Sequence, residues 1–269
     1  MLAWIAKRAT PIAALVLGSS LTGCAYMDDW DDVDGVPLAE LDLSQDTLDT
    51  ISLAGPDSVI IATGDTLAIS LEGDSAAGEA LRFDHEDDRL SIARDRKVYD
   101  GSGRAVVQIT MPPAANLEIA GSGTITADRI AGNAELEIAG SGDIAVADVD
   151  AERLEVEIAG SGTVRASGSA DMVHIEIAGS GDVLLAALSA EDVTVEIAGS
   201  GDVEVASDGR VTAEIAGSGD VVVVGSATCS VQSAGSGSLT CRPRPDGDVA
   251  AGSGSDGDEA NDEDAGAED

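Results

Sequence analysis

The sequence predicts an all-β fold, namely a right-handed parallel β-helix (β-solenoid) of about 18–20 residues per coil with an irregular strand-rich N-terminal part. The main observation is internal repetition, because the pentapeptide Ile-Ala-Gly-Ser-Gly recurs along the second half of the chain. The copies follow one another at intervals of about 18–20 residues, and a period this constant is typical of stacked coils. Six copies begin at Ile119, Ile138, Ile158, Ile177, Ile197 and Ile215, and a seventh, from Ser233, has lost the isoleucine.

The second observation is that each copy holds two segments of alternating character on either side of a glycine-rich bend. Val193, Val195 and Ile197 precede one bend, Val203 and Val205 follow it, and polar residues lie between them. This period of two predicts strands with one inward and one outward face. Glycine permits the bend because it accepts positive φ and close backbone approach. Right-handed winding is expected of parallel crossovers, and we find no six-residue period of the left-handed type.

The third observation is composition. Only five of the 269 residues are aromatic, and none follows Tyr99, so Val, Ile, Leu and Ala must fill any core beyond that point. Such small side chains stack well in regular layers. The formal charge of −37 repels nucleic acid, so we expect no nucleic-acid partner.

The segment before the regular repeats is less uniform. Ile51-Ser52-Leu53-Ala54-Gly55 and Ile69-Ser70-Leu71-Glu72-Gly73 resemble worn copies of the repeat, one repeat period apart. The stretch from Ala80 to Met111 contains five of the twelve arginines and predicts the atypical N-terminal cap that a solenoid needs.

The first residues predict export and lipid anchoring. Lys7 and Arg8 precede a short apolar stretch, and Leu21-Thr22-Gly23-Cys24 then resembles the bacterial lipobox, in which the cysteine is acylated. We therefore expect residues 1–23 to be a lipoprotein signal peptide and Cys24 to be the lipidation site; an ordinary signal peptide with an incidental cysteine is the alternative. Two acyl chains anchor a protein stably. Ala25, in place of an aspartate at this position, favours the outer membrane over the inner one.

The chain divides into four parts. Residues 1–23 form the signal peptide, 24–45 an acidic tether, 46–242 the solenoid with regular repeats over 117–240, and 243–269 a disordered acidic tail. The tail carries ten acidic residues from Asp246 onward, with no Lys or Arg, and cannot bury enough apolar surface to fold.

The repeats, together with the strand-rich head that ends near Ile109-Thr110-Met111-Pro112, resemble the head GIN domain family, also called putative auto-transporter adhesins. The resemblance covers about residues 46 to 240. It implies a β-helical fold and a location in the bacterial cell envelope, and it brings no active-site residues. The chain departs from an autotransporter by ending in an acidic tail, so the lipobox is expected to supply the anchor.

A column of glutamates is the main candidate site. The residue two before each repeat alanine is glutamate in six consecutive copies, which predicts a line of carboxylates on the outside of one sheet. A solubility face that discourages sheet stacking explains it. A Ca²⁺ ladder is the sharper alternative, since Ca²⁺ takes oxygen ligands. Its candidate ligands are Glu137, Glu157, Glu176, Glu196 and Glu214. Asp143, Asp182, Asp202 and Asp220, beside the bend, match a calcium-loop repeat poorly, because their period is too long and other residues interrupt them.

Two further sets of residues bear on chemistry. Cys229 and Cys241 occupy inward positions that flank the last bend symmetrically, so a disulfide that closes the last coil is expected in an oxidising compartment; two buried thiols are the alternative. His85 and His174 are isolated in sequence, and no Ser-His-Asp set or phosphate loop accompanies them. The sequence therefore predicts no catalytic residues, no cofactor and no enzyme activity.

The expected function is that of a lipid-anchored scaffold or adhesin-like binding module of the cell envelope, which presents flat faces to a protein or glycan partner. A Ca²⁺-binding structural protein and a polysaccharide-active β-helix enzyme are the alternatives. The sequence leaves open whether the rod faces the periplasm or the outside.

Overall fold

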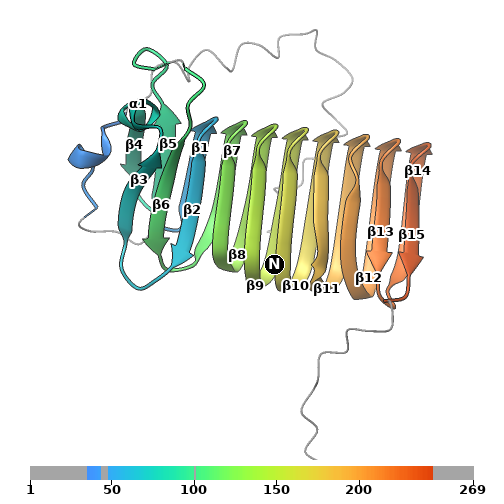
Figure 1. The fold of residues 1–269 in the computed structure, drawn as a ribbon. Helices are drawn as coiled ribbons and strands as arrows, with labels where there is room; N and C mark the ends of the chain where they lie inside the picture. The colour runs from blue at the N-terminus through green and yellow to red at the C-terminus, as the bar shows by residue number, and fades with distance from the viewer. Residues whose placement is uncertain (1–34, 44–47, 100, 245–269) are drawn as a thin grey trace, which may run out of the picture.

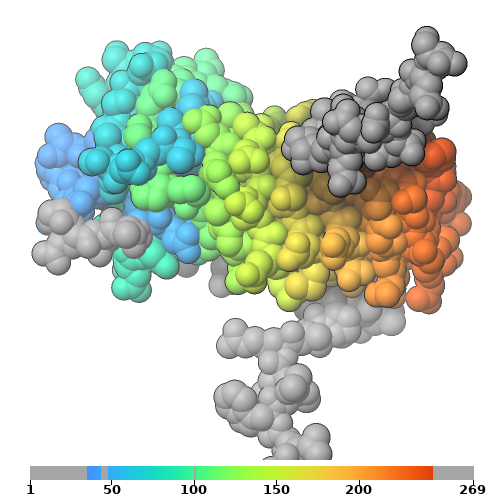
Figure 2. All heavy atoms as spheres, turned by 90° about the horizontal axis from the view of Figure 1, so that it is seen from below, coloured from blue at the N-terminus to red at the C-terminus, as the bar shows by residue number. Residues whose placement is uncertain are grey.

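The computed structural model describes residues 35–43, 48–99 and 101–244, which form an elongated β-solenoid (Figure 1). The rod has about seven turns of about 19 residues each, as the repeat period predicts. Its N-terminal elements lie at one end and its C-terminal strands at the other, and the space-filling view shows the same order along the length (Figure 2).

The helical elements are η3 (Leu38–Glu40) and α1 (Ser75–Glu79). The strands are β1 (Thr50–Gly55), β2 (Ser58–Thr63), β3 (Ala68–Gly73), β4 (Leu81–Glu86), β5 (Arg89–Arg94), β6 (Ala105–Met111), β7 (Ala114–Gly121), β8 (Thr124–Gly140), β9 (Asp143–Gly160), β10 (Thr163–Gly179), β11 (Asp182–Gly199), β12 (Val203–Gly217), β13 (Asp220–Val224), β14 (Thr228–Gly235) and β15 (Ser238–Arg242).

The long strands β8 to β12 are the regular coils. Each runs from one glycine bend across one face of the rod, around a second corner, and back across the other face to the next bend. Neighbours pair in parallel, and identical repeat positions face each other, as in Ile158 with Ile177 and Ile177 with Ile197. The second corner is marked by shifts in register, for example between Arg165 and Ser167. The predicted stacking of equal coils is confirmed.

The glycine bend is fixed by main-chain geometry. The first glycine of each bend has positive φ, 137° at Gly179, which an L-residue rarely adopts. A Cβ atom on Gly179 would also lie 2.2 Å from the carbonyl oxygen of Gly160 in the preceding coil. The amide of Ser180 donates a 2.8 Å hydrogen bond to that same oxygen. The glycine is therefore required twice, by conformation and by the contact between coils.

The core consists of inward columns of aliphatic side chains. The repeat isoleucines are at most 2% exposed, and the valines that flank them are similarly buried. Burial of one such side chain contributes roughly 1.5–3 kcal/mol. Because every coil repeats the same inward positions, the core continues along the rod with no change of packing.

The N-terminal coils do not follow chain order. β1 and β2 lie next to the regular coils, where β1 pairs with β7 and β2 pairs with β8. β5 and β6 form the next coil outward, because β5 pairs in parallel with β1 and β6 in parallel with β2. β3 and β4 then cover this coil with antiparallel pairing, to β6 and β5 respectively, and α1 connects them. We call β3, α1 and β4 the cap.

This topology confirms that one of the two predicted degenerate copies, at Ile51, is a coil of the repeat, and it shows that the other, at Ile69, is not. Ala54 of β1 is in register with Ala120, so the copy at Ile51 is a true coil. The segment from Ile69 is β3, which runs antiparallel in the cap and is not a coil of the repeat. The sequence-based interpretation failed there because alternation is the same in parallel and antiparallel strands. The missing copy is β5, in which Ala93 pairs with Ala54 and Arg94 follows in place of the repeat glycine.

A buried ion pair fastens the segment that connects β5 to β6. The guanidinium of Arg94 bonds both carboxylate oxygens of Asp57, and these side chains are 5% and 0% exposed. Arg94 also donates to the carbonyl oxygens of Gly101 and Gly103, at 3.2 and 2.9 Å, and lies over the ring of Tyr99. Asp57 accepts a further 2.8 Å hydrogen bond from the amide of Ala105.

The C-terminal end is built differently. β14 pairs with β12 and β15 with β13, and no described strand covers their outer edges. Cys229 and Cys241 are joined by a disulfide that connects these two strands, as the sequence predicts. Val231 is 45% exposed there. The last coil is thus closed by a covalent bond instead of a cap.

Several predictions concern residues outside the described ranges. The signal peptide over 1–23, the lipidation site Cys24, the tether (24–45) apart from residues 35–43 and the tail (243–269) apart from residues 243 and 244 belong to this group, and they stay predictions. The boundaries of the four-part division stay predictions as well. No described helix is long and apolar enough to cross a membrane.

Candidate functional site

The most regular chemical feature of the surface is the predicted glutamate column, on the outer face of the sheet that contains β1 and β7. Strand pairing places each glutamate directly opposite the next, so the column runs without interruption through six coils. Adjacent members are therefore separated by about 4.8 Å, the spacing of neighbouring strands. The members are Glu118, Glu137, Glu157, Glu176, Glu196 and Glu214, with Gln232 in the last coil.

The repeat alanines form a second column beside the glutamates. Near the C-terminal end the two columns line a shallow groove of about 580 Å³, which extends from Glu176 and Ala178 to Gln232 and Ala234. We call the surface formed by both columns the acidic face. Its small alanines leave the main chain open to contact, and its carboxylates supply hydrogen-bond acceptors along one side of the groove.

The electrostatics of the acidic face follow from its geometry. The pKa values of Glu137 and Glu157 are raised, mainly because their carboxylates are partly desolvated and then because neighbouring glutamates repel a second charge. Glu135 is the next outward residue before Glu137 on the same strand, and its pKa is raised for the same reasons. At the N-terminal end Arg89 forms an ion pair with Glu118, and this hydrogen bond raises the pKa of Arg89. The negative charge of the column is thus balanced by Arg89 at the N-terminal end, whereas the carboxylates in the middle repel one another.

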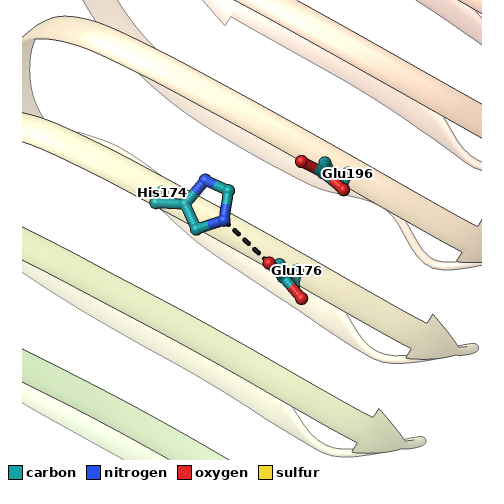
Figure 3. Close-up of side chains that lie close together, drawn as sticks. All are labelled: His174, Glu176 and Glu196. Atoms are coloured by element: carbon teal, nitrogen blue, oxygen red, sulfur yellow. Dashed lines mark hydrogen bonds and ion pairs between the residues drawn. The ribbon is translucent and has the colours of Figure 1, made fainter. Parts of the chain in front are cut away.

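One imidazole interrupts this pattern. His174 lies on β10 beside the column, and its Nε2 is 2.9 Å from Oε1 of Glu176 (Figure 3). Glu196 comes from the neighbouring strand β11, and one potential ligand atom from each of the three residues lies within 4.8 Å of the other two. The sequence-based interpretation of His174 as isolated is therefore wrong, because one partner follows it on its own strand and the other comes from the next coil. The alternation of the strand and the repeat period together would have located them.

The aspartates beside the bend have a structural role. The Oδ1 of Asp202 accepts a 2.9 Å hydrogen bond from the amide of Asp220 in the next coil, and Asp220 does the same for Ser238. Asp208 performs this task at the other corner, where hydrogen bonds from the amide and hydroxyl of Ser226 lower its pKa. These carboxylates satisfy main-chain donors between coils, which accounts for their poor match to a calcium loop.

The opposite face of the rod is less polar. Ala145, Ala147, Leu184 and Ala186 line a shallow depression of about 340 Å³, with Arg165 at its side. The glutamate groove and this depression therefore differ in chemistry, one acidic and the other mainly aliphatic.

The two histidines of the chain do not share a site. His85 lies on β4 in the cap and His174 on β10 in the regular coils, so they belong to different parts of the rod. The polysaccharide-active alternative would need paired carboxylates at a cleft, and the described grooves are shallow surface depressions. That alternative and the Ca²⁺ ladder stay predictions.

The fold and the acidic face define the class of protein: a non-globular solenoid that offers long, repetitive surfaces. The family model for putative auto-transporter adhesin, head GIN domain, matches residues 47–227. This chain belongs to that family. The resemblance stated from the repeats is thereby confirmed.

Solved structures share the fold at low sequence identity. A putative adhesin from Bacteroides fragilis has a TM-score of 0.67 at 17% identity, over 73% of this chain and 93% of its own. A putative lipid binding protein from Parabacteroides distasonis has a TM-score of 0.57 at 22% identity, over the same shares of the two chains. A putative adhesin from the same species has a TM-score of 0.58 at 18% identity, over 74% and 94%. No curated protein matches the chain.

Proposed function

We propose that the protein is a lipid-anchored scaffold of the bacterial cell envelope, which binds a protein or glycan partner in the manner of an adhesin and catalyses no reaction. The observation that carries the proposal is the acidic face, a groove bordered by identical side chains in consecutive coils. Such a surface suits a partner that is itself extended or repetitive, because successive units of the partner meet successive coils. Membership of an adhesin family supports a binding role.

The anchor is the second part of the proposal. Cys24, at the end of the lipobox-like segment, would carry the acyl chains, and Ala25 favours the outer membrane. Replacement of this residue, Cys24→Ala, should move the protein from the membrane fraction to the soluble fraction of lysed cells. Retention of the Cys24→Ala variant in membranes at the wild-type level would contradict lipid anchoring through this residue. Protease treatment of intact cells would then decide whether the rod faces the periplasm or the outside.

Partner binding can be tested at the acidic face. The triple variant Glu137→Gln, Glu157→Gln, Glu196→Gln removes three charges from the column and should lower retention of the full chain on isolated envelope material of the native cells by about tenfold, since loss of a few central contacts dominates most interfaces.

A matched control removes the same number of charges elsewhere. Glu152→Gln, Asp171→Asn and Glu191→Gln change exposed residues near the second corner, away from the acidic face. This control should bind like the wild type. Equal binding by both triple variants would show that the acidic face is not the contact surface, and no binding by the wild type would count against the adhesin-like role itself.

A further inference from the structure

We propose that His174, Glu176 and Glu196 form a binding site for a divalent transition-metal cation such as Zn²⁺, which bridges β10 and β11. The site lies beside the acidic groove but does not depend on the proposed adhesin-like function. Its basis is the convergence of an imidazole nitrogen and two carboxylates from adjacent coils, all within 4.8 Å of one another (Figure 3).

The donor set decides the class of metal. Zn²⁺ and neighbouring transition metals bind imidazole nitrogen together with carboxylate oxygen, whereas Ca²⁺ and Mg²⁺ take oxygen ligands. The other coils of the acidic face offer carboxylates without an imidazole, because the position of His174 is held by Glu155 in one neighbouring coil and by Thr194 in the other. Only at β10 does the described column gain a nitrogen donor.

The geometry requires small adjustments. Three ligands of a tetrahedral Zn²⁺ site lie about 3.3 Å apart, given metal–ligand distances of about 2.0–2.1 Å. His174 and Glu176 already approach to 2.9 Å, and rotation of the half-buried side chain of Glu196 across one strand spacing can complete the set. The imidazole and the carboxylate of Glu176 are 29% and 23% exposed, so a hydrated ion can reach them and keep a water as fourth ligand.

The surrounding charges favour a cation. Glu155 and Glu157 lie in register with His174 and Glu176 in the preceding coil, so two further carboxylates border the three ligands. A bound dication would relieve the repulsion between Glu176 and Glu196, which face each other across the two strands. The site would therefore connect two coils that are otherwise joined only by main-chain hydrogen bonds and packing, and it would stiffen the middle of the rod.

The test measures Zn²⁺ binding to the purified full chain by titration calorimetry with ZnCl₂. We expect one site in the wild type that His174→Gln and Glu196→Gln each weaken by at least about tenfold, since even outer-shell partners change metal affinity by about 10–100-fold. Glu137→Gln is the matched control, because it removes one charge from the same column two coils away, and it should leave the affinity within about twofold. CaCl₂ in large excess should not displace the ion.

A second readout identifies the nitrogen ligand directly. Cu²⁺ loaded at one equivalent should show nitrogen hyperfine splitting from one imidazole in its paramagnetic resonance spectrum, and His174→Gln should abolish it. The proposal is overturned if wild type, His174→Gln and Glu196→Gln bind Zn²⁺ alike, which would indicate adsorption to carboxylates in general. Absence of the nitrogen splitting in the wild-type spectrum overturns it as well, even if one variant fails to fold.

Discussion

The regular coils and the N-terminal part of the rod solve the same packing problem by different means. From β7 to β12 each coil packs on a neighbour with the same repeat pattern, and its interior is filled mainly by aliphatic side chains. The N-terminal part instead contains the buried pair Asp57–Arg94 and the buried Phe83. Among the described residues the buried polar side chains are Thr50, Asp57, Arg94 and Ser207, and the first three belong to this part.

The difference shows what the first coil of a solenoid needs on its outer side. A coil in the middle has its main-chain groups paired on both sides, whereas the first coil needs a different structure on its outer side. Antiparallel strands β3 and β4 supply that cover, and the chain must leave the repeat to make them, which requires specific contacts that a repeat cannot provide. The following predictions test this contrast, beginning with the largest effect.

The largest effect is expected at the glycine bend of a regular coil. Gly179→Ala places a Cβ 2.2 Å from the carbonyl oxygen of Gly160 at a φ of 137°, so steric overlap adds to backbone strain. We expect a loss of about 5 kcal/mol or more in the free energy of unfolding, measured by urea denaturation. Gly132→Ala is the control, because Gly132 also has positive φ (89°) but its Cβ would meet nothing within 4 Å. Its loss should be about 1–2 kcal/mol; equal losses would contradict the contact between coils as the main cause.

The next effect tests the N-terminal network. Arg94→Met leaves the carboxylate of Asp57 buried without its partner and should cost about 3–5 kcal/mol in unfolding free energy. It should also increase protease cleavage near Gly101 and Gly103, since Arg94 holds the carbonyl groups of these two residues.

A compensating variant separates charge burial from loss of packing. Asp57→Asn together with Arg94→Met removes both charges and keeps an oxygen to accept the amide of Ala105. The double variant should recover a large part of the lost stability. A double variant as unstable as Arg94→Met alone would mean that the unpaired charge is not the reason for the loss.

A smaller and local effect is expected at the C-terminal end. Cys229→Ser with Cys241→Ser opens a loop with a sequence separation of 12 residues, which corresponds to about 3 kcal/mol in the chain-entropy model. Because no described strand pairs with the outer edges of β14 and β15, faster amide hydrogen exchange should be confined to them, while β8 to β11 stay protected. Exchange that increases along the whole rod would indicate that the coils unfold as one unit.

The smallest effect concerns pH. The pKa values of Glu135, Glu137 and Glu157 are raised in the folded state, so the fold binds more protons than the unfolded chain as these groups titrate. Their stabilising contribution is present below the unfolded value, near 4.5, and is lost as pH rises through the higher folded values. After allowance for solvent screening of these partly exposed groups, we expect a gain of about 1 kcal/mol at most between pH 7 and pH 5.

The control for this prediction is Glu137→Gln with Glu157→Gln, which should flatten the pH dependence of the melting temperature over that interval. A wild type that loses stability relative to this variant as the pH falls from 7 to 5 would contradict the direction of the shifts.

The repeats made most of the fold predictable. Ile-Ala-Gly-Ser-Gly fixes the bend and the inward isoleucine in six consecutive coils, the glutamate before it fixes the outward column, and the symmetric positions of Cys229 and Cys241 predict their disulfide. The head was less predictable, because β3 alternates as a coil strand does and because Arg94 stands where the repeat has glycine. The environment of His174 was missed since its partner Glu196 becomes a neighbour only after the coils are stacked.

By itself the sequence determined the period, the two faces of each strand and the columns of identical side chains, since each of these depends on local alternation and on glycine at the bend. The tertiary structure alone decided the order of the N-terminal coils, the antiparallel cap and the buried Asp57–Arg94 pair. These features arise between segments far apart in the chain, where several pairings satisfy the same alternation and only the packing of the whole rod selects one.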